Sequence, residues 1–316
     1  MADEKRRWRS EPATYYDQPA LKAAHWDWRV SSYIFVAGLA GGAQMLATMA
    51  GEAGSVRRNG RYLGFLGSLV CAPLLIWDLK TPKRFYNMLR IFRASSPMSF
   101  GSYILTGFGL FSGLTAFGQF LGARGLALGG RLAALLQWPA AAFGAGMSCY
   151  TGALLSSTST PLWAAAPRLL AARLAASSIA AGAAALSLGE QCAGEEGRLR
   201  RRGLDRIACL ASGVGLGLSL LLERRWRQRG VASAVESGQA AQLERGALVL
   251  GHVVPLACYA AQRLSSRHSE TLSVVGGLSI LVGGYLTREA LLQGGADSTR
   301  RPRDYFRFAR SEREHG

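Results

Sequence analysis

Eight long stretches of this 316-residue chain contain no Asp, Glu, Lys or Arg, and this absence is its most informative feature. A helix that spans a bilayer needs roughly 20 mostly apolar residues. The shorter stretches reach that length if the flanking Arg and Lys side chains extend to the lipid headgroups. We therefore predict an all-α, multi-pass membrane protein with spans in residues 30–51, 62–77, 94–123, 132–167, 174–189, 207–222, 246–262 and 271–287.

Acidic residues are scarce, with 20 Asp and Glu against 37 Lys and Arg. In a soluble protein such a balance favours a nucleic-acid partner. Here the Arg residues lie between apolar stretches, where anionic lipid and membrane topology explain them better. We expect membrane lipid and no nucleic acid as a partner. The first 29 residues lack the apolar core of a secretory signal peptide, so none is predicted.

Residues that hold metals and haem are also few. The five Cys residues form no C-x-x-C motif, so we interpret them as structural thiols rather than as ligands of a metal or an iron–sulfur cluster. A di-haem cytochrome b needs four axial His ligands. Of the four His residues only His252 lies inside a predicted span. This pattern argues against a haem-bearing anchor.

The distribution of positive charge indicates an orientation. Eight spans place both termini on one side, here named face A, together with the loops 79–98, 156–168 and 223–245. Face A carries 24 Lys and Arg residues against 12 on the opposite side, face B. Cytoplasmic loops are enriched in Lys and Arg, so the count predicts that face A is cytoplasmic. The two tails contribute 13 of the 24 basic residues on face A, and without them the count is 11 against 12.

Several polar side chains lie close to face A in the predicted spans. They are Tyr33 in the first span, Asp78 at the end of the second, Tyr150 in the fourth and His252 in the seventh, with His25 just before the first. One interpretation is an ordinary belt of interfacial aromatic and helix-end residues. Asp78 and His252 follow or interrupt apolar sequence and need partners, so we expect a shallow polar pocket open to face A.

The centres of the spans carry few polar residues. Gln44, Gln119 and Gln137 are predicted to hydrogen-bond between helices. No Lys or Arg and no clear carboxylate is expected at mid-depth, which argues against an ion pump. A secondary transporter remains a less favoured alternative, because Pro139 and Pro255 offer helix breaks but no repeat symmetry is visible.

The loop after the second span carries the most specific signal. Residues 78–101 read DLKTPKRFYNMLRIFRASSPMSFG. This segment resembles the NrfD/PsrC family, the integral membrane subunits of polysulfide reductase-like complexes. The segments YYDQPALK at 15–22, HWDW at 25–28, GLAGG at 38–42, SCYTGALL at 148–155 and PLW at 161–163 fit the same family. The specific motifs cover the first half of the chain, and the eight-span plan covers all of it.

The resemblance implies a fold and a set of partners. Family members are built as two four-helix bundles, here 30–165 and 166–292, between an N-terminal segment 1–29 and a basic tail 293–316. They exchange electrons with a quinone pool and carry no haem or iron–sulfur cluster of their own. An extrinsic four-cluster iron–sulfur subunit docks on the face of the N-terminus, usually with a molybdopterin catalytic subunit beyond it.

The resemblance also implies a quinone site. In the family, quinone is held by a Tyr that matches Tyr150, by a first-helix residue that matches Tyr33 and by an acidic residue near Asp78. The first-helix residue is a His in the family example, so His25 and His252 are added as candidate proton donors. Quinone reduction moves two electrons and two protons, and hydroxyl, imidazole and carboxyl groups suit its proton steps.

Two questions stay open at this point. Many relatives place their extrinsic partners outside the bacterial cytoplasmic membrane, whereas the charge count places face A inside. Either the complex works on a cytoplasmic substrate, or the tails mislead the count. A purely structural anchor without a quinone site is the principal alternative, and the sequence does not separate it from a quinone-reactive subunit.

Overall fold

The computed structural model describes residues 21, 26–51, 54–79, 81–90, 92–93, 96–192, 194–264 and 269–301. In this part of the chain helices are joined by short turns, and no strand is present. The all-α prediction is therefore confirmed.

Eight helical segments are long and apolar enough to cross a membrane, which confirms the predicted number of spans among the described residues. The long helices are α2 (Trp28–Met49), α3 (Gly54–Asp78), α5 (Pro97–Ala123), α6 (Ala127–Ser156), α8 (Pro167–Gly189), α9 (Gly194–Gln228), α11 (Gly238–Leu248), which continues through η3 (Val249–Val253) into α12 (Val254–Leu264), and α13 (Glu270–Arg300). The short elements are η1 (Pro82–Arg84), α4 (Asn87–Arg90), α7 (Pro161–Ala164), η2 (Glu190–Cys192) and α10 (Ser233–Glu236).

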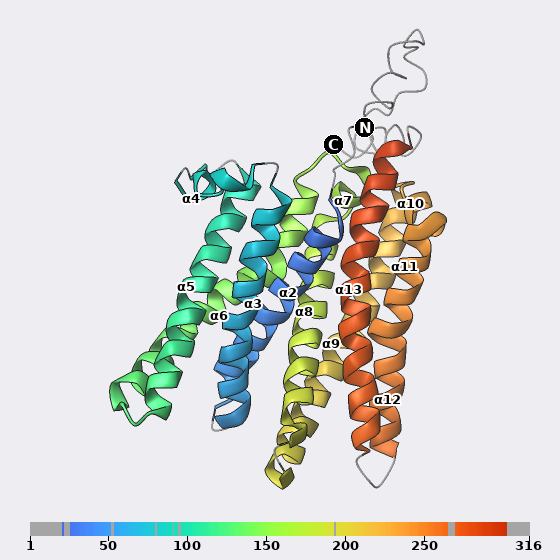
Figure 1. The fold of residues 1–316 in the computed structure, drawn as a ribbon. Coiled ribbons are helices and arrows are strands. Elements are labelled where there is room, and N and C mark those ends of the chain that lie inside the picture. The colour runs from blue at the N-terminus through green and yellow to red at the C-terminus, as the bar shows by residue number, and fades with distance from the viewer. Residues whose placement is uncertain are drawn as a thin grey trace.

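The first and last long helices share one end of the molecule. In Figure 1, α2 begins and α13 finishes at the upper end, where α4, α7 and α10 also lie. This end is face A. Proline and glycine set several of the turns between spans. Pro97 and Pro167 occupy the first positions of α5 and α8, and Gly51 and Gly125 adopt positive φ angles of 53° and 91° in the turns after α2 and α5.

Most of the helices are longer than the uncharged stretches that predicted them. In α9, charged residues continue the helix at both ends through pairs one turn apart, Arg200–Glu196 at 3.1 Å and Arg227–Glu223 at 2.6 Å. In α13 the helix runs on to Arg300. The helix therefore extends well beyond residue 287, where the predicted span ends, and Arg288 lies within it.

Glycine allows the central helices to approach closely. A Cβ at Gly41 of α2 would lie 2.4 Å from the Gly144 carbonyl oxygen of α6, and one at Gly42 would lie 2.3 Å from the Ser178 carbonyl oxygen of α8. In α13, a Cβ at Gly283 would lie 2.1 Å from the Gly251 amide nitrogen. Such small-residue contacts let backbones pack where lipid provides no hydrophobic drive. Because α2 contacts both α6 and α8, it stands at the centre of the molecule.

In chain order, we name α2, α3, α5 and α6 the first half and α8, α9, α11–α12 and α13 the second half; Figure 1 shows α2 and α8 next to each other in the middle of the molecule. Sequential neighbours pack together within each half. Contacts of α2 with α8 and α13, and of α6 with α8, join the halves. The division into two independent bundles at residue 165 stays a prediction.

Candidate functional site

Tyr150 lies on an open, mostly apolar cavity near the face A end of the first half. The cavity, here named the Tyr150 pocket, has a volume of about 480 Å³. It is formed by α5, α6 and α8 and lined by Pro97, Phe100, Ile104, Gly146, Cys149, Tyr150, Ala153, Leu154 and Ala171. The Tyr150 hydroxyl donates a hydrogen bond of 2.8 Å to the Pro97 carbonyl oxygen. The pocket is therefore apolar with one phenol on its wall.

Gly101 makes room for the Tyr150 ring. A Cβ at this position would lie 2.2 Å from both Cζ and Oη of Tyr150. No side chain other than hydrogen fits there without moving the ring. The motif at residues 78–101 ends at this glycine. Gly101, the last residue of this motif, therefore allows α5 to pack close to the Tyr150 ring of α6.

Tyr33 is near Tyr150 and is buried, with 7% of its surface exposed. Tyr150 and Cys71 of α3 are the titratable side chains near it. The Cys71 thiol donates to the Tyr33 carbonyl oxygen at 3.8 Å. The structure thus brings together two of the residues predicted for the site, which come from α2 and α6.

Asp78 lies at the face A edge of this region, where it ends α3 and is half-buried. Its charged neighbours are Asp27 and Arg29 at the start of α2. Arg29 lies 4.8 Å above the Trp77 ring, and its backbone amide donates to the Asp27 carboxylate at 2.9 Å. Arg29 and Tyr33 are one turn apart on α2, so Asp78 lies beside the helix that carries Tyr33.

Neither of the two His residues predicted for the site is found at the Tyr150 pocket among the described residues. His25 lies outside the described residues. His252 belongs to the second half and lies in the π-helix η3. In this segment the Val254 amide donates to the Val249 carbonyl oxygen. Pro255 follows and has no amide proton with which to continue a regular α-helix. A Cβ at Gly215 of α9 would lie 2.6 Å from His252 Cε1. His252 packs on α9 and is not among the residues that line the Tyr150 pocket.

The matched family agrees with this fold. A family model described as polysulphide reductase, NrfD, matches residues 19–297. The chain belongs to the NrfD family. None of the curated proteins matches it. NrfD proteins are the membrane subunits of polysulfide reductase-type oxidoreductases, whose complexes contain iron–sulfur and molybdenum subunits. The chain is thus a multi-pass NrfD membrane subunit, and the match extends the resemblance across both halves.

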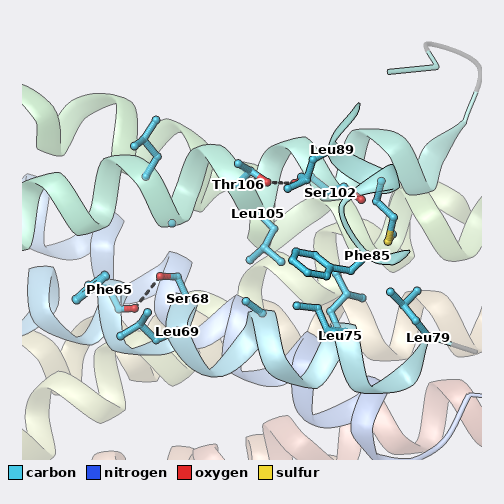
Figure 2. A pocket seen from close by; sticks show the side chains of 15 residues that line it. Phe65, Ser68, Leu69, Leu75, Leu79, Phe85, Leu89, Ser102, Leu105 and Thr106 are labelled. Atoms are coloured by element: carbon cyan, nitrogen blue, oxygen red, sulfur yellow. Dashed lines mark hydrogen bonds between the residues drawn. The ribbon is translucent and has the colours of Figure 1, made fainter. Parts of the chain in front are cut away.

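This NrfD chain has a second cavity in its first half, between α3 and α5 and beneath α4. This α3–α5 pocket has a volume of about 380 Å³, and Figure 2 shows its lining of Leu, Phe and Met side chains. Its hydroxyl groups are already used: Ser68 donates to the Phe65 carbonyl oxygen and Thr106 to the Ser102 carbonyl oxygen, both at 2.7 Å. The pocket suits a hydrocarbon chain rather than a polar ring.

The prediction for Gln119 and Gln137 is confirmed, because both accept hydrogen bonds from Arg61 of α3. The Arg61 Nη2–Gln137 Oε1 distance is 2.7 Å. Gln44 instead donates within α2 to Thr48 at 3.4 Å. Sequence reasoning missed Arg61 because it lies just before the predicted second span, residues 62–77. The helix α3 starts at Gly54 and takes Arg61 into the packed interior.

The second half buries charged side chains, whereas the expectation of no charge at mid-depth of the membrane stays a prediction. Arg173 of α8 is 1% exposed, and its Nη2 lies 2.6 Å from Glu244 Oε1 of α11, a charge contact that lacks hydrogen-bond geometry. Arg288 of α13 donates to Ser177 Oγ at 2.5 Å and to Ser178 Oγ at 3.1 Å. The sequence contained a signal for the buried Arg173, because only Arg168 and Arg173 interrupt the uncharged sequence from 132 to 189.

Proposed function

We propose that this NrfD protein is the quinone-reactive membrane anchor of its complex. It passes electrons between an extrinsic four-cluster iron–sulfur subunit and the membrane quinone pool, with a molybdopterin catalytic subunit beyond. The observation that carries this proposal is the Tyr150 pocket. This cavity is apolar, has a single phenol on its wall and lies near the buried Tyr33. It is close to face A, where the first and last described residues also lie (Figure 1).

The pocket suits a quinone ring in size and polarity. Small-molecule sites usually have volumes of roughly 300–1,000 Å³, an apolar lining and a few polar groups, and this cavity of about 480 Å³ fits that description. A phenol donates one hydrogen bond. On binding, the Tyr150 hydroxyl would donate to a quinone carbonyl instead of the Pro97 carbonyl. The two hydrogen bonds are similar in strength, so the exchange costs little free energy. Because the pocket is open, the hydrocarbon tail can extend from it into lipid.

Asp78 is proposed as the group that exchanges protons with water at face A. Reduction of a quinone to a quinol takes up two electrons and two protons, and the reverse reaction releases them. A half-buried carboxylate beside Arg29 can pass protons between the site and the water outside. Tyr33 and Tyr150 are proposed to hydrogen-bond the two quinone carbonyls.

The loop around α4 is proposed as the docking surface for the iron–sulfur subunit. Phe85, Tyr86 and Phe92 are exposed there, next to Arg84 and Arg90. Exposed aromatic and Arg side chains are enriched at protein interfaces. We place the protein in a bacterial cytoplasmic membrane with face A in the cytoplasm, on the basis of 24 basic residues against 12.

The Tyr150→Phe variant tests the quinone site. If the hydroxyl stabilises the transition state by ~2–3 kcal/mol, quinone-linked turnover of the complex should fall by roughly 30- to 150-fold. Electron transfer from the catalytic subunit to a soluble artificial acceptor should be unchanged. Tyr103→Phe is the matched control, because Tyr103 donates a similar bond of 2.7 Å to the Leu89 carbonyl oxygen outside the Tyr150 pocket. Full quinone activity in Tyr150→Phe would instead support a purely structural anchor.

A further inference from the structure

The α3–α5 pocket can be reached from the lipid that surrounds the first half. Two leucines of its lining, Leu69 of α3 and Leu110 of α5, are each more than half exposed. Because both belong to membrane spans, their exposed surfaces contact lipid. Towards face B the pocket ends where Phe65 packs over Gly113, since a Cβ there would lie 3.2 Å from Phe65 Cε2. The pocket is thus an apolar hollow that opens sideways into the membrane.

The loop around α4 closes the same pocket at face A. Phe85, Met88 and Leu89 line it from that side, and Figure 2 shows the Phe85 ring between Leu75 of α3 and Leu105 of α5. The lining on α3 runs from residue 65 to residue 79, which is about 21 Å along a helix. One leaflet contributes half of a hydrocarbon core of roughly 30 Å. The pocket is therefore long enough for a lipid acyl chain.

A second cavity, here named the Arg93 pocket, adjoins the first at the start of α5. It has a volume of about 310 Å³ and is lined by Met88, Arg93, Ser96, Met98, Ser99 and Ser102. Met88 and Ser102 line both cavities, so the two lie side by side. Unlike its apolar neighbour, the Arg93 pocket has a guanidinium group and several hydroxyl groups on its wall.

The polar groups of the Arg93 pocket can still bind a ligand. The Ser96 side chain forms no cap hydrogen bond at the start of α5. Ser99 Oγ accepts a hydrogen bond of 3.1 Å from the Arg93 backbone amide, which leaves the hydroxyl proton of Ser99 to donate. The Arg93 side chain is exposed. A guanidinium beside two hydroxyls matches the acceptors of a phosphate group, to which Arg donates strong charge-assisted hydrogen bonds.

The positive charge around α4 is not balanced by acidic residues. The basic side chains in or next to this helix are Lys83, Arg84, Arg90 and Arg93. None of them forms an ion pair with a residue that the structure describes. No Asp or Glu occurs from residue 79 to residue 189, a stretch that includes α5 and α6. This region therefore favours an anion that another molecule supplies.

We infer that the two adjoining cavities together bind one molecule of an anionic phospholipid. Its acyl chain fills the α3–α5 pocket, and its phosphate group accepts hydrogen bonds from Arg93, Ser96 and Ser99. Basic segments next to membrane spans attract anionic headgroups. A zwitterionic headgroup fits less well, because its ammonium group would lie among the basic side chains around α4.

The hydroxyl groups of the α3–α5 pocket favour an acyl chain over a quinone ring. Ser102 donates to the Met98 carbonyl oxygen at 3.1 Å, and Ser68 and Thr106 also donate to carbonyls of their own helices. These hydroxyls offer a quinone carbonyl no free proton, whereas an acyl chain needs none. The inference holds whether or not the Tyr150 pocket binds a quinone.

Lipid binding by the full-length chain tests the proposal. The protein would be purified in a mild detergent, and native mass spectrometry would follow the binding of added phosphatidylglycerol or phosphatidylcholine. We expect one phosphatidylglycerol to bind at least about tenfold more tightly than phosphatidylcholine. Arg93→Gln should weaken the binding of phosphatidylglycerol about tenfold, as expected when a charge-assisted hydrogen bond to phosphate is lost.

Arg124→Gln is the matched control, because Arg124 is an exposed basic residue at the other end of α5, beside the Phe120 ring. This variant should bind phosphatidylglycerol like the wild type. Equal affinity of the wild type for the two lipids would overturn the proposal. Equal affinity of Arg93→Gln and Arg124→Gln for phosphatidylglycerol would overturn it as well.

Ala72→Phe tests the acyl chain separately from the headgroup. Ala72 lines the α3–α5 pocket but not the Arg93 pocket, so the added ring takes up acyl-chain volume and leaves the phosphate contacts in place. Binding of phosphatidylglycerol should again fall about tenfold or more. Since Arg93 is exposed, Arg93→Gln should fold even if Ala72→Phe does not.

Two further measurements separate the phospholipid from other ligands of these cavities. Inorganic phosphate added to the wild type should not displace phosphatidylglycerol, because it cannot fill the apolar pocket. Displacement by phosphate alone would show a site for free phosphate and contradict the proposal. Mass spectrometry of the extracted lipids should identify an anionic phospholipid as the molecule that Arg93→Gln loses. A quinone lost in its place would likewise contradict the proposal.

Discussion

The two halves of the molecule bury polar groups in different ways. In the first half, most buried hydroxyls donate to carbonyls of their own helix, as Ser112 and Thr115 do, and the buried Arg61 is held by neutral Gln side chains. In the second half, Arg173 faces the carboxylate of Glu244 across two helices. The first half therefore holds its buried cation with neutral amides, whereas the second half pairs buried charges of opposite sign.

This difference shows how one eight-helix protein can hold two kinds of site. An apolar ligand such as a quinone needs a cavity with few competing polar groups, which the first half provides at Tyr150. Buried charges cost free energy and persist in membrane proteins where they have partners or a function. Substitutions that remove each type of contact should therefore have different effects on stability and activity in the two halves.

The largest effect is expected in the second half, at the Arg173–Glu244 pair. Arg173→Leu leaves the Glu244 carboxylate largely buried without its counter-charge, which typically costs about 3–5 kcal/mol. Unfolding of the purified protein in detergent would measure the loss. The double variant Arg173→Leu, Glu244→Leu removes both charges and should recover most of the stability. A double variant as unstable as the single one would show that the pair does not act as a unit.

A smaller loss is expected for the buried cation of the first half. Arg61→Leu removes the donors to Gln119 and Gln137 but leaves no charge behind. Two amide oxygens without partners should cost about 1–3 kcal/mol in the same unfolding measurement. If Arg61→Leu proved more destabilising than Arg173→Leu, the contrast drawn between the halves would fail.

Gly101→Ala should affect quinone activity more than stability. The added methyl group would displace the Tyr150 ring, since a Cβ there lies 2.2 Å from its hydroxyl. Quinone-linked turnover should drop about tenfold, equivalent to about 1.4 kcal/mol. Gly109→Ala on the same helix is the control, because its Cβ would meet only Ser68, with Oγ at 3.7 Å and Cβ at 3.9 Å. Equal turnover in the two variants would argue that Tyr150 does not need its present position.

The smallest effect is expected in the α3–α5 pocket. Thr106→Val removes a hydroxyl that bonds only to the Ser102 carbonyl of its own helix, so stability should change by no more than about 0.5 kcal/mol. Quinone turnover should also stay at the wild-type level, as steady-state kinetics of the complex would show. A strong loss of turnover would move the quinone ring from the Tyr150 pocket to the α3–α5 pocket.

Much of the fold was predictable, because each apolar stretch must bury its backbone polar groups in a helix when it enters lipid. The number of spans and the family followed from local sequence at the uncharged stretches and at residues 78–101. Tyr33 and Tyr150 were also named in advance, and the structure places them close together. Their role in quinone binding stays a prediction, as do those of Asp78, His25 and His252.

The second half was harder to anticipate. A lone Arg in sequence does not reveal whether it extends to the headgroups or pairs inside, and Arg173 and Glu244 are 71 positions apart. Likewise, the predicted last span ended at residue 287, just before Arg288, but α13 continues beyond it. Helix length and rotation decide such cases, and neither follows from hydropathy.

The sequence alone therefore determined that this chain is an eight-span NrfD membrane protein, because the lipid environment imposes helices on long uncharged stretches regardless of their neighbours. Only the tertiary structure decided which polar residues meet. Gly101 admits the Tyr150 ring, Arg61 reaches Gln137, and Arg173 reaches Glu244 through contacts between helices distant in the chain. Such contacts depend on the rotation and close approach of packed helices, which are set by the whole bundle and not by any one segment.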